Sequence, residues 1–245
     1  MTVKSSEPHP TYTNPTVNEA ICDIHFTIPE GLSWNSSYYS KYFTLIQGEY
    51  SLFEPVFDSG APVFDKSSTK MRFYHDKRNH YIQLSELALT INELQPYLGW
   101  QIMQTDILNA WGVHREAIGP VQIDAVSLRY VNFILAENEH QKLGEWLEKN
   151  PYVADSVLTM QPSFSQVLST TQKGTRLLIN TGEIKSPPED GERTFVLDIN
   201  AMYMVDEGSQ IEISAVINQL HNEVWEIFNG FKSDKLDGLL NEEVN

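Results

Sequence analysis

The sequence is poor in cysteine, in long apolar runs and in signals that direct a chain to a membrane. One cysteine, Cys22, stands among 245 residues, and a single thiol cannot form an internal disulfide. This usage is typical of a reducing compartment, so we expect a cytoplasmic protein. No apolar run approaches the roughly 18 residues that cross a bilayer, and residues 1–16 lack the apolar segment of a signal peptide. We therefore expect no contact with a membrane.

Positive charge is also scarce, with 17 Lys and Arg residues against 33 Asp and Glu residues and a formal net charge of −16. This balance argues against the broad cationic surface on which nucleic-acid affinity depends. The imbalance is strongest between Glu183 and Glu243, where 14 acidic residues accompany four Lys or Arg residues. A solvated outer surface would account for it, and so would electrostatic steering toward a basic partner.

The chain lacks the short motifs of common catalytic and nucleotide-binding sites. It has no GxxxxGK[ST] phosphate loop, no GxSxG, HExxH or CxxC motif and no glycine-rich dinucleotide fingerprint. We therefore expect no cofactor, no bound metal and no catalytic residue. Scattered His and Asp side chains could still converge in the fold, which keeps an enzyme open as an alternative.

The first half of the chain reads as β-α-β-β-α. Alternating apolar residues predict a strand at 18–28 that buries Cys22. Ser33 or Asn35 can cap a helix that continues to about Leu52. Two β-rich runs, KMRFYH and HYIQLSELALTIN, predict a hairpin, and apolar residues at helical spacing predict a helix at 100–118.

The second half reads as β-α-β-β-β-α. Alternation returns at 121–135, where it predicts a strand with Arg129 on one face and Tyr130 on the other. HQKLGEWLEKN predicts a short helix, FSQVLSTT and TRLLINTGEI a second hairpin, and TFVLDINAMYM a further strand. The clearest helix is the long one at 213–231, whose wide apolar stripe should pack across a sheet.

The repeated order of elements predicts an internal duplication. An offset of 104 places Asp23-Ile24-His25-Phe26 under Ser127-Leu128-Arg129-Tyr130. We expect an α+β fold of two related β-α-β-β-(β)-α units, about a pseudo-twofold axis, with antiparallel sheets and helices packed on them. The expected division is a flexible N-terminal tail at 1–16, a first unit at 17–120 and a second at 121–245. The long C-terminal helix would cross the join.

Four spaced motifs add a resemblance to this reading: NPTVNEAICDIHFTIPEG, LQPYLGWQ, VSLRYVNFI and LHNEVWEIF. Together they resemble the "sporadically distributed" family of uncharacterised prokaryotic proteins, over about residues 14–235. The resemblance implies an accessory gene in a mobile or defence-associated locus and brings no reaction or catalytic residue with it. The family commonly has a Glu-x-Arg pair in the first strand where this chain has Asp23 and His25, so any charge couple there is weakened.

Arg129 is the first candidate for a site, with His25 at the matching position of the first unit. A guanidinium on a covered strand needs an anion or several carbonyl groups, which Asp124 or Asp198 could supply. The two cations therefore either hold the molecule together or bind an anion or a partner.

Residues 66–80 form the second candidate, a basic hairpin within an acidic chain. It contains the cations Lys66, Lys70, Arg72, Lys77 and Arg78 and the imidazoles of His75 and His80. A solvated hairpin tip and a docking site for nucleic acid or an acidic partner are both compatible with this composition. Two imidazoles without a third ligand do not predict a zinc site.

The leading hypothesis is a non-catalytic binding or scaffold protein that acts as an accessory subunit, through a protein partner or as a homo-oligomer. It depends on the separation of charge and on the missing catalytic motifs. One alternative is an enzyme or a sensor of a small anion or nucleotide, with a pocket between the two halves that Arg129 and His25 face. Another is nucleic-acid contact, through the basic hairpin alone.

Overall fold

A computed structural model describes residue 9 and residues 11–29, 34–57, 69–136, 140–148, 164–171, 173–185 and 193–242. These residues form an α+β fold with one nine-stranded antiparallel sheet and five helices. The strands are β1 (Val17–Thr27), β2 (Leu52–Phe57), β3 (Thr69–Tyr74), β4 (His80–Leu84), β5 (Ala88–Leu94), β6 (Gln122–Leu135), β7 (Phe164–Thr170), β8 (Arg176–Lys185) and β9 (Arg193–Met204). The helices are α1 (Ser37–Ile46), α2 (Trp100–Ile118), α3 (Leu143–Trp146), α5 (Ile213–Phe231) and α6 (Asp234–Asn241). None of these helices has the length and apolar character that crossing a membrane requires.

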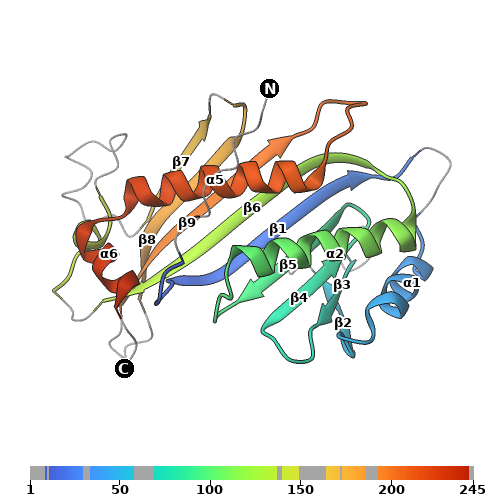
Figure 1. Ribbon diagram of the computed structural model, residues 1–245, viewed down its shortest axis with the longest axis horizontal. Coiled ribbons are helices and arrows are strands. Elements are labelled where there is room, and N and C mark those ends of the chain that lie inside the picture. The colour runs from blue at the N-terminus through green and yellow to red at the C-terminus, as the bar shows by residue number, and fades with distance from the viewer. Residues whose placement is uncertain are drawn as a thin grey trace.

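The two halves of the chain meet at the centre of a single sheet. The strand order is β2-β3-β4-β5-β1-β6-β9-β8-β7, so β1 and β6 lie side by side in the middle (Figure 1). From this pair outward, each half places its last strand next to its first. Asp23 lies opposite Ser127, the two positions that the offset of 104 aligns. The matched strand order fits two related units, but among the described residues four strands follow the first helix where two were predicted, and three follow the short helix of the second half. Their origin by duplication stays a prediction.

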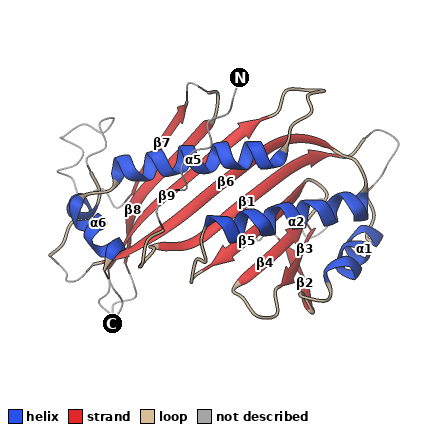
Figure 2. Ribbon diagram, in the orientation of Figure 1, coloured by secondary structure: helices blue, strands red, loops and turns tan. Residues whose placement is uncertain are grey.

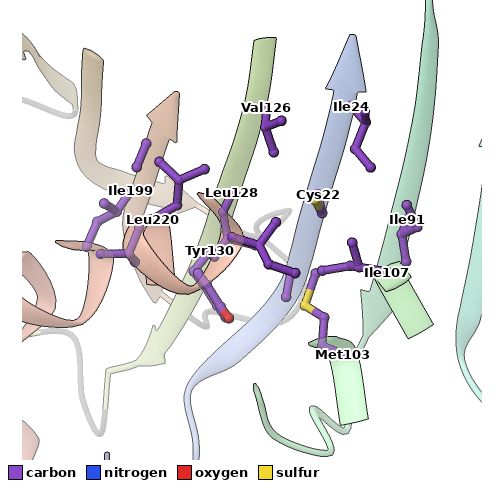
Figure 3. Packing of buried hydrophobic residues seen from close by; sticks show 14 of the residues in the cluster. Cys22, Ile24, Ile91, Met103, Ile107, Val126, Leu128, Tyr130, Ile199 and Leu220 are labelled. Atoms are coloured by element: carbon purple, nitrogen blue, oxygen red, sulfur yellow. The ribbon is translucent and has the colours of Figure 1, made fainter. Parts of the chain in front are cut away.

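The two long helices α2 and α5 lie on the same face of the sheet (Figure 2). Strand alternation explains this arrangement, because every second residue of β1 from Ala20 to Phe26 is buried. Figure 3 shows Met103 and Ile107 of α2 close to Ile91 of β5, and Leu220 of α5 near the central strands. No described helix covers the other face of the sheet. The sheet therefore has one apolar face that the long helices cover and one face that no described helix covers.

Cys22 is buried on the helix-covered face, as the alternation predicts. Burial raises the pKa of its thiol well above the usual range, and the neighbouring charge of Asp23 acts in the same direction. The thiol therefore stays protonated near neutral pH and packs as a small apolar group.

Several elements differ in length from their predictions. The long helix α5 has the predicted bounds, but α1 ends at Ile46 and the chain turns through Gln47, Gly48 and Glu49 instead of continuing to Leu52. The edge strand β2 follows, and it contains Pro55, which an edge strand tolerates because one side of it makes no ladder hydrogen bonds. The short helix α6, after the long helix, was also not predicted.

His114 is an unusual member of the core. Its side chain lies on α2 between the rings of Trp111 and Phe26, with centroid distances of 4.9 and 4.5 Å, and it is 0% exposed. Neither of its ring nitrogens has a hydrogen-bond partner among the described residues. Burial lowers the pKa of His114 to about 4, so the imidazole is neutral at pH 7. The same cause lowers the pKa of His80 to about 4.

Acidification should therefore destabilise the fold through these histidines. An unfolded histidine has a pKa of about 6.5, so the unfolded chain takes up the proton first, and stability present above that pH is lost as the pH falls toward 4. His114→Phe should remove up to about 3 kcal/mol of this loss while leaving the free energy of unfolding at pH 7 unchanged or higher. Urea denaturation of the wild type and of the variant, at pH 7 and at lower pH, measures how the free energy of unfolding changes with pH. A variant that keeps the wild-type pH dependence would contradict the assignment.

Candidate functional site

Arg129 and His25 lie on the face of the sheet that no described helix covers. The Arg129 guanidinium donates from Nε and Nη2 to the two carboxylate oxygens of Asp198, each at 2.8 Å. Asn180 donates to the same carboxylate at 2.8 Å. The hydrogen bonds from the Arg129 guanidinium to Asp198 raise the pKa of Arg129. Asp198 is one of the two acids that the sequence offered as a partner. The pair joins β6 to β9 and supports a structural role for Arg129.

Two carboxylates of β1 on this face are hydrogen-bonded to neighbouring strands. Asp23 accepts hydrogen bonds from Thr90 of β5 at 2.6 Å and from Ser127 of β6 at 3.2 Å. Glu19 accepts from Asn92 of β5 at 2.8 Å and from Tyr81 of β4 at 3.0 Å. These bonds cross from strand to strand and use the polar atoms that a ligand would otherwise meet. His25 sits in the same row of β1, opposite Ala125.

The arginines of the basic hairpin are engaged within the chain. Arg78 donates to both carboxylate oxygens of Asp106 on α2, at 2.8 and 3.0 Å. Arg72 lies on the uncovered face, where it donates to the Tyr74 hydroxyl at 3.1 Å and sits 4.6 Å from the Tyr81 ring centroid. The two guanidinium groups therefore have different neighbours and do not form one cationic surface.

The remaining hairpin residues are also dispersed. His75 accepts from the backbone N–H groups of Lys77 and Arg78, and His80 is 2% exposed. Lys70 lies on β3, Lys77 lies in the turn before β4, and Lys66 is outside the described residues. Within the described part of the chain, no group of three or more His, Cys, Asp or Glu residues could hold a metal ion.

A pocket of about 460 Å³ lies on the helix-covered face, between the start of α2, the middle of α5, residues 9 and 11–17 and the central strands. Its lining residues include neither Arg129 nor His25, and none of them is Asp, Glu, Lys or Arg. In a chain with 20% charged residues, this composition marks the pocket as a neutral site. Its lining includes the aromatic and amide side chains of Tyr12, Tyr97, Trp100, Gln101, Gln104, Tyr130, Asn132, Asn218, Asn222, Trp225 and Phe228.

One face of α5 supplies much of this lining. Asn218, His221, Asn222 and Trp225 follow the spacing i, i+3, i+4 and i+7, which places them on one side of a helix. The buried apolar stripe of the same helix packs against the sheet. Three of these four residues lie inside the motif LHNEVWEIF and Asn218 lies just before it, but the wide apolar pattern of the helix drew attention away from them. Polar residues within an otherwise apolar helical pattern were the signal that could have identified these pocket residues.

Hydrogen bonds hold the pocket side chains in position. The hydroxyl groups of Tyr97 and Tyr130 lie 3.1 Å apart, and the Tyr130 hydroxyl lies 3.3 Å from Nδ1 of His221. The Asn218 side-chain oxygen accepts from Gln104 at 2.8 Å and from the Trp100 indole at 3.4 Å. These bonds connect α2, β6 and α5, so the pocket is assembled from both halves of the chain.

Aromatic rings line the same space in a continuous row. His221 stacks on Trp100 with a centroid distance of 4.1 Å and an interplanar angle of 7°. His9 stacks on Trp225 at 4.8 Å, and the two imidazoles meet edge to face at 5.2 Å. Tyr12 also stacks on Trp225, at 5.6 Å. The described part of segment 9–17 therefore packs against α5.

The electrostatics of the pocket favour binding over acid–base chemistry. Burial, with a smaller contribution from His9, lowers the pKa of His221 to about 3, so its ring is neutral at pH 7 and is a weak base. Burial raises the pKa of Tyr130 well above its usual range, which keeps its hydroxyl protonated. The lining offers hydrogen bonds and ring faces, and it holds no activated nucleophile.

The chain matches no protein-family model and no curated protein sequence. Membership of the "sporadically distributed" family therefore stays a prediction from its four motifs.

The structural role of Arg129 can be measured directly. Arg129 is 42% exposed but its partner Asp198 is only 7% exposed, so Arg129→Ala leaves a covered carboxylate without its cation. We expect the free energy of unfolding to fall by about 1–3 kcal/mol in urea denaturation. The double variant Arg129→Ala/Asp198→Asn should recover part of this loss, because it removes the unpaired charge. A change within about 0.5 kcal/mol for the single variant would contradict the structural role.

Proposed function

We propose that this chain binds a small, uncharged molecule in the pocket between α2 and α5. The observation that carries the proposal is the neutral, aromatic lining of a cavity of about 460 Å³. Small-molecule sites typically enclose about 300–1,000 Å³, with apolar and aromatic walls and a few placed polar groups. The position of the pocket, between helices and over the join of two halves, is also one where such sites recur.

The pocket favours this reading over a sensor of a free anion. An anion in a covered site needs a cation or several donors to offset its desolvation, and the lining has no Lys or Arg. Arg129, the cation that the sequence offered for this task, is bonded to Asp198 on the other face of the sheet. A neutral ligand avoids this cost.

Action through a protein partner is the second candidate. The acidic stretch from Glu183 to Glu243 favours it, because a concentrated charge of one sign speeds encounter with a basic protein. An accessory role in a mobile or defence-associated prokaryotic locus is what the family resemblance implies for such a partner. The two candidates are compatible, since a bound ligand could alter how the surface of α5 is presented. Direct nucleic-acid contact has less support, because Arg72 and Arg78 are bonded within the chain.

A matched pair of variants tests the proposed pocket. Asn222→Phe fills the pocket from α5, and Asn229→Phe makes the same change at an exposed position of the same helix. The probe is a library of uncharged metabolites that covers heterocycles, saccharides and aliphatic compounds, each at ~1 mM. A ligand at about five times its Kd adds about 1 kcal/mol of stability, which raises Tm by about 2–4 °C for a chain of this size.

We expect at least one compound to raise the Tm of the wild type and of Asn229→Phe, and to leave Asn222→Phe unchanged. A library without effect on the wild type, or an equal response of both variants, would overturn the proposed function.

A further inference from the structure

We infer that the pocket takes an uncharged heterocycle of the nucleobase class, whose ring replaces the His9 imidazole on Trp225 and pairs with the side-chain amide of Asn222. This inference rests on the proposed function and names the ligand class of the same site.

The protein's own His9 shows how such a ring is held. Its imidazole, itself a flat heterocycle with nitrogen atoms on its edge, stacks on Trp225 at 4.8 Å with an interplanar angle of 24°. Nε2 of the same ring lies 2.7 Å from the side-chain oxygen of Asn222. Trp225 and Asn222 belong to α5, whereas His9 comes from a segment more than two hundred residues away in the chain. A free heterocycle can therefore make the same two contacts without the segment.

The amides of α5 add a second constraint on the ligand. The side-chain oxygens of Asn218 and Asn222 already accept hydrogen bonds, while their amide nitrogens have no partner among the described residues. An asparagine amide carries one acceptor and two donors side by side. Once His9 leaves, Asn222 offers both kinds of group, which matches a ligand edge with an N–H next to a carbonyl oxygen or ring nitrogen. Asparagine pairs with adenine in this bidentate way.

The ring row accounts for the preference for a planar ligand. Trp100, His221, His9 and Trp225 are already arranged ring against ring across the pocket. Stacking on an aromatic side chain accepts any base, because every base has a π-face. A saccharide packs only C–H groups against such rings and has no π-face of its own, and an aliphatic compound would leave the amide donors unsatisfied.

The absence of Lys and Arg from the lining limits the ligand to a base or nucleoside rather than a nucleotide. His221 does not supply the missing charge, because its ring is neutral at pH 7. A phosphate group would therefore enter without a counter-charge from Lys, Arg or His221.

Isothermal titration calorimetry with adenosine, guanosine and uridine tests the inference, with glucose, maltose and adenosine monophosphate as comparison probes. We expect at least one nucleoside to bind and the saccharides not to bind. Asn222→Leu should raise the Kd for that nucleoside at least about tenfold, and Asn229→Leu should leave the Kd unchanged. His9→Ala should lower the Kd for that nucleoside about three- to tenfold, because no internal ring then competes for Trp225. Thermal unfolding of each variant checks that the fold is intact.

The outcomes separate this inference from the proposed function. Saccharides or aliphatic compounds that bind in place of nucleosides, and lose binding in Asn222→Phe, would overturn the ligand class and leave the pocket in use. A nucleotide that binds more tightly than its nucleoside would overturn the requirement for neutrality. Unchanged affinity in Asn222→Leu or in His9→Ala would overturn the proposed contacts. No binding by any probe or library compound would overturn the proposed function as well.

Discussion

The antiparallel pairing of β1 with β6 is the constraint on which the rest of the structure depends. These two strands are where the halves of the sheet are hydrogen-bonded to one another, with Ala20 opposite Tyr130 and His25 opposite Ala125. A slip by one residue would turn every side chain of one strand to the wrong face. Cys22 and Ile24 would leave the core, and Asp23 would enter it. The register therefore decides both which face the helices cover and which polar groups meet on the other.

Two different faces of the sheet follow from this register. On the uncovered face, carboxylates and amides of neighbouring strands bond to one another, and the Arg129–Asp198 pair belongs to this lattice. On the helix-covered face, α2 and α5 contact each other, and Tyr130 of β6 is linked to His221 of α5 and to Tyr97, which lies just before α2. Many charged side chains lie on the opposite face and on the outer surface, and no Asp, Glu, Lys or Arg side chain is among the residues that line the pocket.

The sequence predicted the parts of this fold that depend on local periodicity. Alternation identified β1 and β6 and assigned Arg129 and Tyr130 to opposite faces, and helical spacing identified α5 with its bounds. Local patterns could not show that α2 and α5 converge, because that depends on how the β1–β6 pair places two helices from distant parts of the chain. The local pattern therefore did not single out the pocket residues Asn218 and Asn222. Arg78 was similarly read as part of a basic tip, since its partner Asp106 lies on an element distant in the sequence.

The segment 9–17 connects the pocket to the outer elements of the second half. The Thr16 carbonyl accepts from the N–H of Phe133 at 2.9 Å, and the Asn14 N–H donates to the Leu240 carbonyl of α6 at 3.0 Å. The Tyr12 hydroxyl accepts from Lys232, just beyond α5, at 3.1 Å. These contacts anchor the segment beside β6 and α6 at positions that do not depend on the His9 ring. Displacement of the His9 ring from Trp225 would therefore leave the hydrogen bonds of Tyr12, Asn14 and Thr16 in place.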